Sequence, residues 1–183
     1  DSNYAYGKSY VYTRSGTTWS LQQSVSASKY TFNQAQPEFG EYVDISEDGN
    51  LIIVGWSGAI VGPSADQKRL GGVDIFSRSG STWSHVDLIE ESVYQLNSNA
   101  EIGENIQLAT ETKDRIVFSA RGDQSAWVWV NNSGWARESE LVPSTTPSST
   151  YGYNASINAT GTVAAVTDRG NESVYIFTRS GST

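Results

Sequence analysis

The chain has 183 residues and a formal net charge of −8, and this length suffices for one domain with a substantial core. Its 12 lysines and arginines form no cluster, so we expect no nucleic-acid-binding face, and repulsion disfavours docking on anionic lipid. The absence of cysteine excludes a disulfide scaffold, and without an apolar run of membrane-spanning length we expect no membrane insertion.

One short pattern occurs four times: an apolar, β-prone run, then a polar Ser-Gly turn, then usually a tryptophan. The copies are YVYTRSGTTW, VDIFSRSGSTW, WVWVNNSGW and VYIFTRSGST. Their turn glycines lie 64, 54 and 47 residues apart, at Gly16, Gly80, Gly134 and Gly181. Self-similarity at such a period indicates a repeat architecture.

The first repeat predicts four strands in two hairpins, at residues 9–13, 19–25, 42–46 and 51–55. Gly16 supplies the first turn, and Asp48-Gly49 between two β-rich runs is a strong hairpin signal. In the first strand Tyr10 and Tyr12 point to one side and Val11 to the other, so both sides are largely apolar. This pattern predicts strands that are covered on both faces.

Four antiparallel strands at this period describe a propeller blade. We predict an all-β fold and a single repeat domain over residues 1–183, with blades at about 7–62, 71–122 and 124–170. Residues 171–183 provide the first strand of a fourth blade, so the propeller is partial or is completed by an oligomer. A sandwich of about a dozen strands is the alternative.

The strand-and-turn copies, the Phe39-Gly40 pair and the hairpin ISEDGNLIIVG resemble the FG-GAP repeat family, whose members form β-propellers like the head of integrin α chains. The resemblance covers nearly the whole chain, and the third repeat departs most from the pattern. It implies an extracellular or cell-surface location and a role in adhesion or surface structure. Some members are accessory modules of enzymes.

Many repeats of this family bind Ca²⁺ through a loop of the type D-x-D/N-x-D-G-x-x-D. Asp44, Ser46 and Asp48 stand at matching positions, but Ile52 occupies the last ligand position and cannot bind a cation. Ca²⁺ requires six to eight oxygen ligands. We therefore expect no metal site and no cofactor, with Ca²⁺ at Asp44, Ser46 and Asp48 left open beside an ordinary β-turn.

Catalytic residues of the common types are scarce. His85 is the only histidine, and with no cysteine the chain has no His-Cys or two-histidine arrangement for nucleophilic or metal-assisted catalysis. We therefore expect that the chain is not an enzyme.

Four N-glycosylation sequons suggest a secreted glycoprotein. They begin at Asn131, Asn154, Asn158 and Asn171.

The expected function is a non-catalytic adhesion or structural module that makes protein–protein contacts. Self-association is expected through a terminal strand that is apolar on both sides, at Val174, Tyr175, Ile176 and Phe177. Such a chain assembles into a fibre or a larger propeller, or it belongs to a longer polypeptide. The alternatives are an accessory domain of a secreted enzyme and a carbohydrate-binding propeller. In the latter the candidates for stacking on sugar rings are Trp56, Trp127 and Trp129, although tryptophans also fill space between blades.

Overall fold

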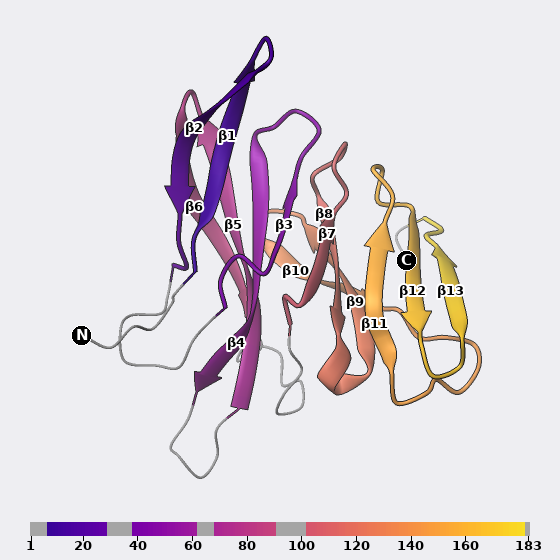
Figure 1. Ribbon diagram of the computed structural model, residues 1–183. Helices are drawn as coiled ribbons and strands as arrows, with labels where there is room; N and C mark the ends of the chain where they lie inside the picture. Colours follow the sequence, from indigo (N-terminus) through magenta and orange to yellow (C-terminus); the bar gives the residue numbers. More distant parts are fainter. Residues whose placement is uncertain (1–6, 29–37, 62–67, 91–101, 182–183) are drawn as a thin grey trace.

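The computed structural model describes residues 7–28, 38–61, 68–90 and 102–181, and these residues form an all-β fold. The first six and last two residues of the expected domain lie outside the described residues. The strands make four antiparallel sheets, which follow one another in chain order and pack face to face (Figure 1). In the described part of the chain, no helix is long and apolar enough to cross a membrane.

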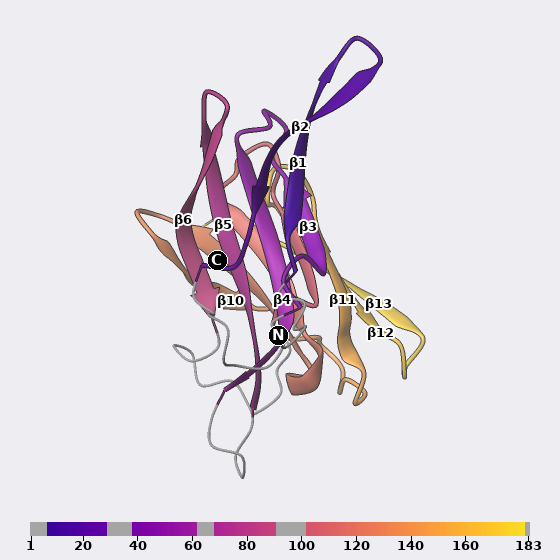
Figure 2. The same ribbon diagram turned by 60° about the vertical axis from the view of Figure 1, so that its left-hand side comes forward.

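The first sheet contains two strands and the second contains four. In the first sheet β1 (Ser9–Ser15) pairs with β2 (Thr18–Val25). The second sheet has the spatial order β3 (Tyr42–Ile45), β4 (Leu51–Val61), β5 (Lys68–Ser79) and β6 (Thr82–Glu90). The tip of the β1–β2 hairpin projects beyond the other strands, as Figure 2 shows.

The third sheet again contains four strands, and the fourth contains three. The third consists of β7 (Asn105–Leu108), β8 (Arg115–Ala120), β9 (Ser125–Asn131) and β10 (Trp135–Glu140), with a short turn of 3-10 helix, η2 (Arg121–Asp123), between β8 and β9. The fourth consists of β11 (Tyr151–Ile157), β12 (Val163–Asp168) and β13 (Ser173–Thr178).

The expected strands are present, but they group differently from the expected repeats. Residues 7–62 were expected to form one blade, whereas β3 and β4 join β5 and β6, and β1 and β2 form a sheet of their own. The prediction of three four-stranded blades is corrected to two four-stranded sheets, flanked in the described chain by one sheet of two strands and one of three. The ladder between β4 and β5 continues to the pair Val61 and Lys68, so these strands form a hairpin. The chain instead passes from one sheet to the next after β2. The order of strands along the sequence does not show which connections stay within a sheet and which lead to another sheet.

In the central strands of the two inner sheets, successive apolar residues point to opposite faces and both faces are covered. In β4, Ile52 and Val54 belong to the cluster beneath the first sheet, and Ile53 belongs to the cluster between the second and third sheets. In β8, Phe118 faces the second sheet and Val117 faces the fourth. The prediction of strands covered on both faces is confirmed for β4 and β8. It is wrong for β1, on which it was based, because Tyr10 and Tyr12 are 56% and 51% exposed.

Three hairpins carry a β-bulge at the same position, and this fixes the correspondence between sheets. The bulge residue lies three positions after the hairpin tryptophan in each case: Gln22 after Trp19, Val86 after Trp83, and Glu138 after Trp135. Beside the bulge, the partner strands carry Tyr12, Phe76 and Trp129. Residues at equal distances from the bulge can therefore be compared directly between sheets.

A glycine at the start of the inner strand lets each sheet approach the backbone of the preceding one. Gly103 has a φ of +87°, and a Cβ placed on it would lie 2.3 Å from the carbonyl oxygen of Gly72. Gly152 has a φ of +75°, and its Cβ would lie 2.4 Å from the carbonyl oxygen of Ser125. Positive φ and lack of space both require glycine here.

Substitution of these glycines separates backbone strain from steric conflict. Gly80→Ala, at a φ of +61° with no atom within 4 Å of the added Cβ, is expected to lower the free energy of unfolding by roughly 1–2 kcal/mol. Gly103→Ala adds a clash with backbone and is expected to cost roughly 3 kcal/mol or more. Urea denaturation of both variants measures the difference. Equal losses would show that the close approach does not stabilise the packing of the sheets.

Candidate functional site

The hairpin tryptophans show how one sheet covers the next. The indole Nε1 of Trp83 donates to Oε1 of Gln22, the bulge residue of the first sheet, at 2.8 Å. Gln23 bonds the backbone N–H and C=O of Trp83, at 2.8 and 2.9 Å. Trp83 is therefore 4% exposed, whereas Trp19, at the same position of the first sheet, is 64% exposed. Trp19 lacks a preceding sheet in the described structure.

The inner strand β3 shows the same difference. Val43 is 61% exposed, whereas Ile106, at the corresponding position of β7, is 6% exposed because the second sheet covers it. Ile45 is exposed and its counterpart Leu108 is buried. The face of β3 that points away from the third sheet therefore has the composition of a packing surface but carries no cover.

Residues of β1 and β3 line a hollow of about 490 Å³ between these two strands. Tyr10 and Tyr12 lie on one side, and Val43 and Ile45 lie on the other, with Ile52 among the residues that line it. The sequence alone did not indicate that β3 carries an exposed packing surface. Comparison of its residues with their counterparts in β7 reveals the surface, and this comparison requires the observed grouping of strands.

The fourth sheet exposes its opposite face. Val174 on β13 is 60% exposed, whereas Val73, its counterpart on β5, is fully buried against the third sheet. Ile176 is likewise exposed, while Tyr175 and Phe177 pack against the cluster between the third and fourth sheets. Of the four residues expected to drive self-association, two therefore face outward and two face inward.

A second hollow, of about 220 Å³, lies between β10 and the fourth sheet. Its lining includes Leu141, Phe177 and Glu138, the bulge residue of the third sheet. Glu138 accepts hydrogen bonds from Arg115 at 2.8 and 3.0 Å and from Arg179 at 3.1 Å. Burial opposes the charge of Glu138, but these hydrogen bonds outweigh it and lower its pKa. The hollow is largely apolar, and the charged residues at its wall are Glu138, Glu140 and Arg179.

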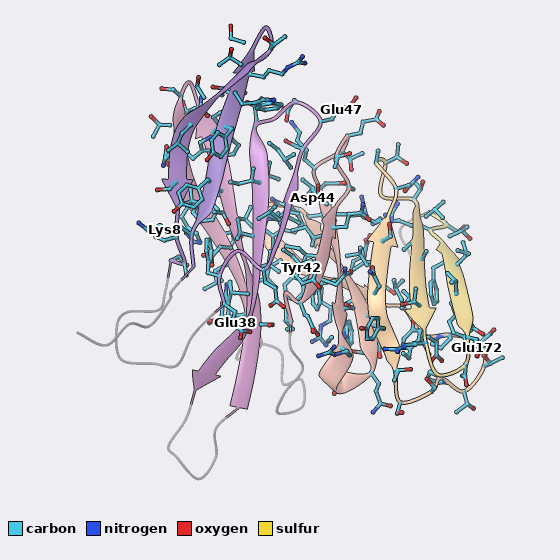
Figure 3. All side chains as sticks on the ribbon, in the orientation of Figure 1. Lys8, Glu38, Tyr42, Asp44, Glu47 and Glu172 are labelled. Carbon is cyan, nitrogen blue, oxygen red and sulfur yellow. The ribbon has the colours of Figure 1, made fainter. Side chains whose placement is uncertain are left out.

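The oxygens of the candidate Ca²⁺ loop make hydrogen bonds with protein groups. The carboxylate of Asp44, labelled in Figure 3, accepts from the backbone N–H of Leu108 and of Ile45, both at 2.8 Å. Ser46 Oγ donates to Asp48 at 2.7 Å, and Lys113 Nζ lies 2.7 Å from the other oxygen of Asp48. Within the described ranges, no group of three or more metal-binding side chains is present. The ammonium group of Lys113 thus lies against a carboxylate of the candidate loop.

Lys113 controls the titration of Asp48. Its hydrogen bond is the largest cause of a pKa for Asp48 well below the ordinary 3.8, followed by those of Ser46 and Asn50. A lowered pKa contributes stability above pH 4 that is lost as the pH falls. Lys113→Ala is expected to raise the pKa of Asp48 and to flatten this acid dependence, whereas Lys113→Arg keeps the pKa low. An NMR titration of the Asp48 carboxyl tests this, and an unchanged pKa in Lys113→Ala would contradict it.

The candidate sugar-stacking tryptophans form part of the packing between sheets. Trp56 and Trp129 are buried, so the expectation that they stack on a ligand is corrected. Both side chains lie on faces that a neighbouring sheet covers. Trp127 is half-buried, and the guanidinium of Arg137 lies 3.9 Å from its ring centroid. In this position Arg137 covers the face that a sugar would need.

His85 belongs to a polar cluster inside the second sheet. Asp74 is buried, and its carboxylate lies 3.0 Å from His85 Nε2, 2.9 Å from Trp56 Nε1 and 3.2 Å from the backbone N of Ser28. Burial is the main cause of a raised pKa for Asp74. This carboxylate holds β4, β5, β6 and the segment after β2 together, which is a structural role for the single histidine.

The four sequon asparagines are exposed, but their side-chain amides differ. Nδ2 of Asn158 donates to Thr160 and Thr162 within the β11–β12 turn, and Nδ2 of Asn171 donates to Asp168 at 3.0 Å. At Asn131 the turn uses Oδ1, which accepts from Ser133 and Gly134. Asn154 lies on the outward face of β11. Attachment of a glycan at Nδ2 therefore disturbs fewer of the observed bonds at Asn131 and Asn154.

Comparisons with known proteins find similarity among solved structures at low sequence identity. No protein-family model matches the chain, and no curated protein matches it. Among solved structures the chain is similar to one from Bacteroides fragilis NCTC 9343, described as "a putative 6-phosphogluconolactonase", with 11% identity and a TM-score of 0.45. The similarity covers 87% of this chain and 56% of the other, so this chain spans just over half the length of that protein.

The expectation that the chain is not an enzyme is corrected: the similar structure bears the name of an enzyme, and the likeness itself assigns no activity to this chain. The expectation depended on the presence of one histidine and no cysteine. That argument is too narrow, since carboxylates alone can supply acid, base and nucleophile in hydrolysis. The exclusion is therefore withdrawn.

Proposed function

We propose that this chain is a repeat module of the FG-GAP kind whose sheets act as propeller blades. It works outside the cell or at its surface, through contacts with other proteins and with further copies of itself. The observation that carries this proposal is the exposure of Trp19, Val43 and Val174 at positions that are buried in the inner sheets. Exposed apolar faces mark sites of interaction with other proteins.

The arrangement of the sheets supports a propeller-like architecture. Four sheets follow one another along the chain, each antiparallel, and each packs its face on the next. Sequential antiparallel sheets that pack face to face are typical of the blades of a propeller. The burial of Trp56 and Trp129 removes two of the three tryptophans that were candidates for sugar binding, and this favours protein contacts.

Static light scattering over a range of protein concentrations tests the proposed contacts. The chain is expected to associate, and the variant with both Trp19→Ser and Val43→Ser is expected to require at least a tenfold higher concentration. Val86→Ser is the matched control, because Val86 is exposed on β6 away from both end faces. A chain that stays monomeric at all concentrations, or a control that weakens association equally, would contradict the proposal.

Secretion through a glycosylating pathway predicts a specific pattern of sugar attachment. In material from such cells, we expect a glycan at Asn131 before Asn158, because the Nδ2 atom of Asn158 is used within its turn. Peptide mapping with and without amidase treatment measures occupancy at each asparagine. Occupancy confined to Asn158, or no glycan at any sequon, would refute this expectation.

A further inference from the structure

The incomplete sheets at the two ends complement each other. We propose that the fourth sheet of one copy and the first sheet of a second copy join into a single four-stranded sheet. β11 and β12 of one copy supply the first two strands, and the β1–β2 hairpin of the other copy supplies the third and fourth. This inference rests on the proposed function, because it names the partner and the geometry at the same end surfaces.

Strand order makes the two sheets complementary. In the complete second and third sheets, the outer hairpins β5–β6 and β9–β10 hold the third and fourth positions. By the shared bulge, β1 and β2 correspond to these positions, so the first sheet lacks its first two strands in the described chain. The fourth sheet holds the first three positions and, among the described residues, lacks the fourth.

β1 and β13 are equivalent strands that compete for the third position. Both end in the sequence Thr-Arg-Ser-Gly, at 13–16 and 178–181. β13 pairs with β12, and β1 pairs with β2 through seven residues. If β1 replaces β13 beside β12, one ladder is exchanged for an equivalent ladder, and the β1–β2 hairpin stays intact. The exchange therefore costs little pairing energy, and the newly buried apolar surface favours it.

The hollow beside β3 lies where the two incoming strands pack. Within the chain, Leu51 and Ile53 of β4 pack in the cluster that buries Ile106 and Leu108. The corresponding residues of β12 are Val163 and Ala165, which lie on the outward face of the fourth sheet. In the joined sheet they reach Val43 and Ile45 of the second copy, and the exposed inner strand is covered as β7 is covered.

A series of polar contacts along the inner strands leads to the same pairing. The backbone N–H of Leu108 donates to Asp44 at 2.8 Å, and that of Ile157 donates to Gln107 at 2.7 Å. Each acceptor lies at the same position of the preceding inner strand. The next member of the series is Ser156, whose hydroxyl retains acceptor capacity. In the joined sheet it faces the N–H of Ile45 in the second copy, which then shares its proton between this hydroxyl and the Asp44 carboxylate that it bonds within its own chain.

A similar bond runs from the N–H of Ala155 to Asn105 at 2.9 Å. Asn154 occupies the position of Asn105 one sheet further on, and the residue opposite it in the second copy is Val43. Asn154 and Ser156 are both exposed in the single chain, so their oxygens are accessible to the edge of β3.

The hollow beside Glu138 receives the tryptophan of the incoming hairpin. Trp83 rests on Gln22, the bulge residue of the sheet before it. Glu138 is the bulge residue of the third sheet, and the hollow of about 220 Å³ lies next to it. In the joined sheet, Trp19 of the second copy occupies this hollow with its indole N–H toward the Glu138 carboxylate. One exchange thus fills both hollows.

The contact is head to tail, because the two surfaces lie on opposite ends of the chain (Figure 1). Each copy then contributes its second sheet, its third sheet and one joined sheet. If the rotation between copies closes, two copies form a ring of six sheets, and if it does not, the copies form an open filament.

Disulfide trapping tests the joined sheet, and the absence of native cysteine makes it specific. Val163 pairs with Thr178, whose equivalent is Thr13, so Val163→Cys and Thr13→Cys place two thiols opposite each other only across the joint. In one chain β1 and β12 lie at opposite ends (Figure 1), so a disulfide must link two copies. After oxidation at high protein concentration, we expect at least five times more linked chains than in the control with Val163→Cys and Val86→Cys.

Adding Trp19→Ser to the trapped pair is expected to reduce linkage severalfold, while circular dichroism confirms that each variant remains folded. Equal linkage in the trapped pair and the control would overturn the joined sheet. If light scattering shows association through the end faces but the trapped pair does not link, the proposed function stands and the joined sheet is wrong. A chain that neither associates nor links would refute both.

Discussion

The face-to-face packing of consecutive sheets is the interaction on which this structure depends. Each inner sheet is apolar on both faces, so it is stable only with a neighbour on each side. The distance between neighbours is set at the inner strand, where Gly103 lies against the backbone around Gly72 and Gly152 lies against Ser125. Burial of the apolar clusters and close backbone approach therefore act at the same junctions, and the face of a sheet without a neighbour remains exposed.

Polar groups make the packing specific. At each inner junction a side-chain oxygen of one sheet accepts an edge N–H of the next, as Asp44 does for Leu108 and Gln107 does for Ile157. These bonds satisfy backbone groups that strand pairing leaves at a sheet edge. Lys113 adds a charged contact from the third sheet to Asp48 of the second. The same residues that resemble a Ca²⁺ loop thus link two sheets without a metal ion.

The sequence predicts much of this architecture because turns and alternation are local signals. The Asp48-Gly49 turn, the hairpin glycines and the antiparallel strands follow from spacing and composition alone. The grouping of strands into sheets does not, because the crossing after β2 and the hairpin after β4 join similar strands. Burial of Trp56 depends on the neighbouring sheet for the same reason. The exposed face of β3 was not predicted, since it appears only when Val43 is compared with its counterpart Ile106.

Hydrogen exchange at the backbone amide of Val43, measured across a range of protein concentrations, tests most directly whether a second copy covers the exposed inner strand. Exchange at Val43 is predicted to slow at least tenfold as the concentration rises, while exchange at exposed Val86 on β6 stays constant. Equal exchange at Val43 at all concentrations, in samples that light scattering shows to be associated, would contradict the account, because the copies would then meet through another surface.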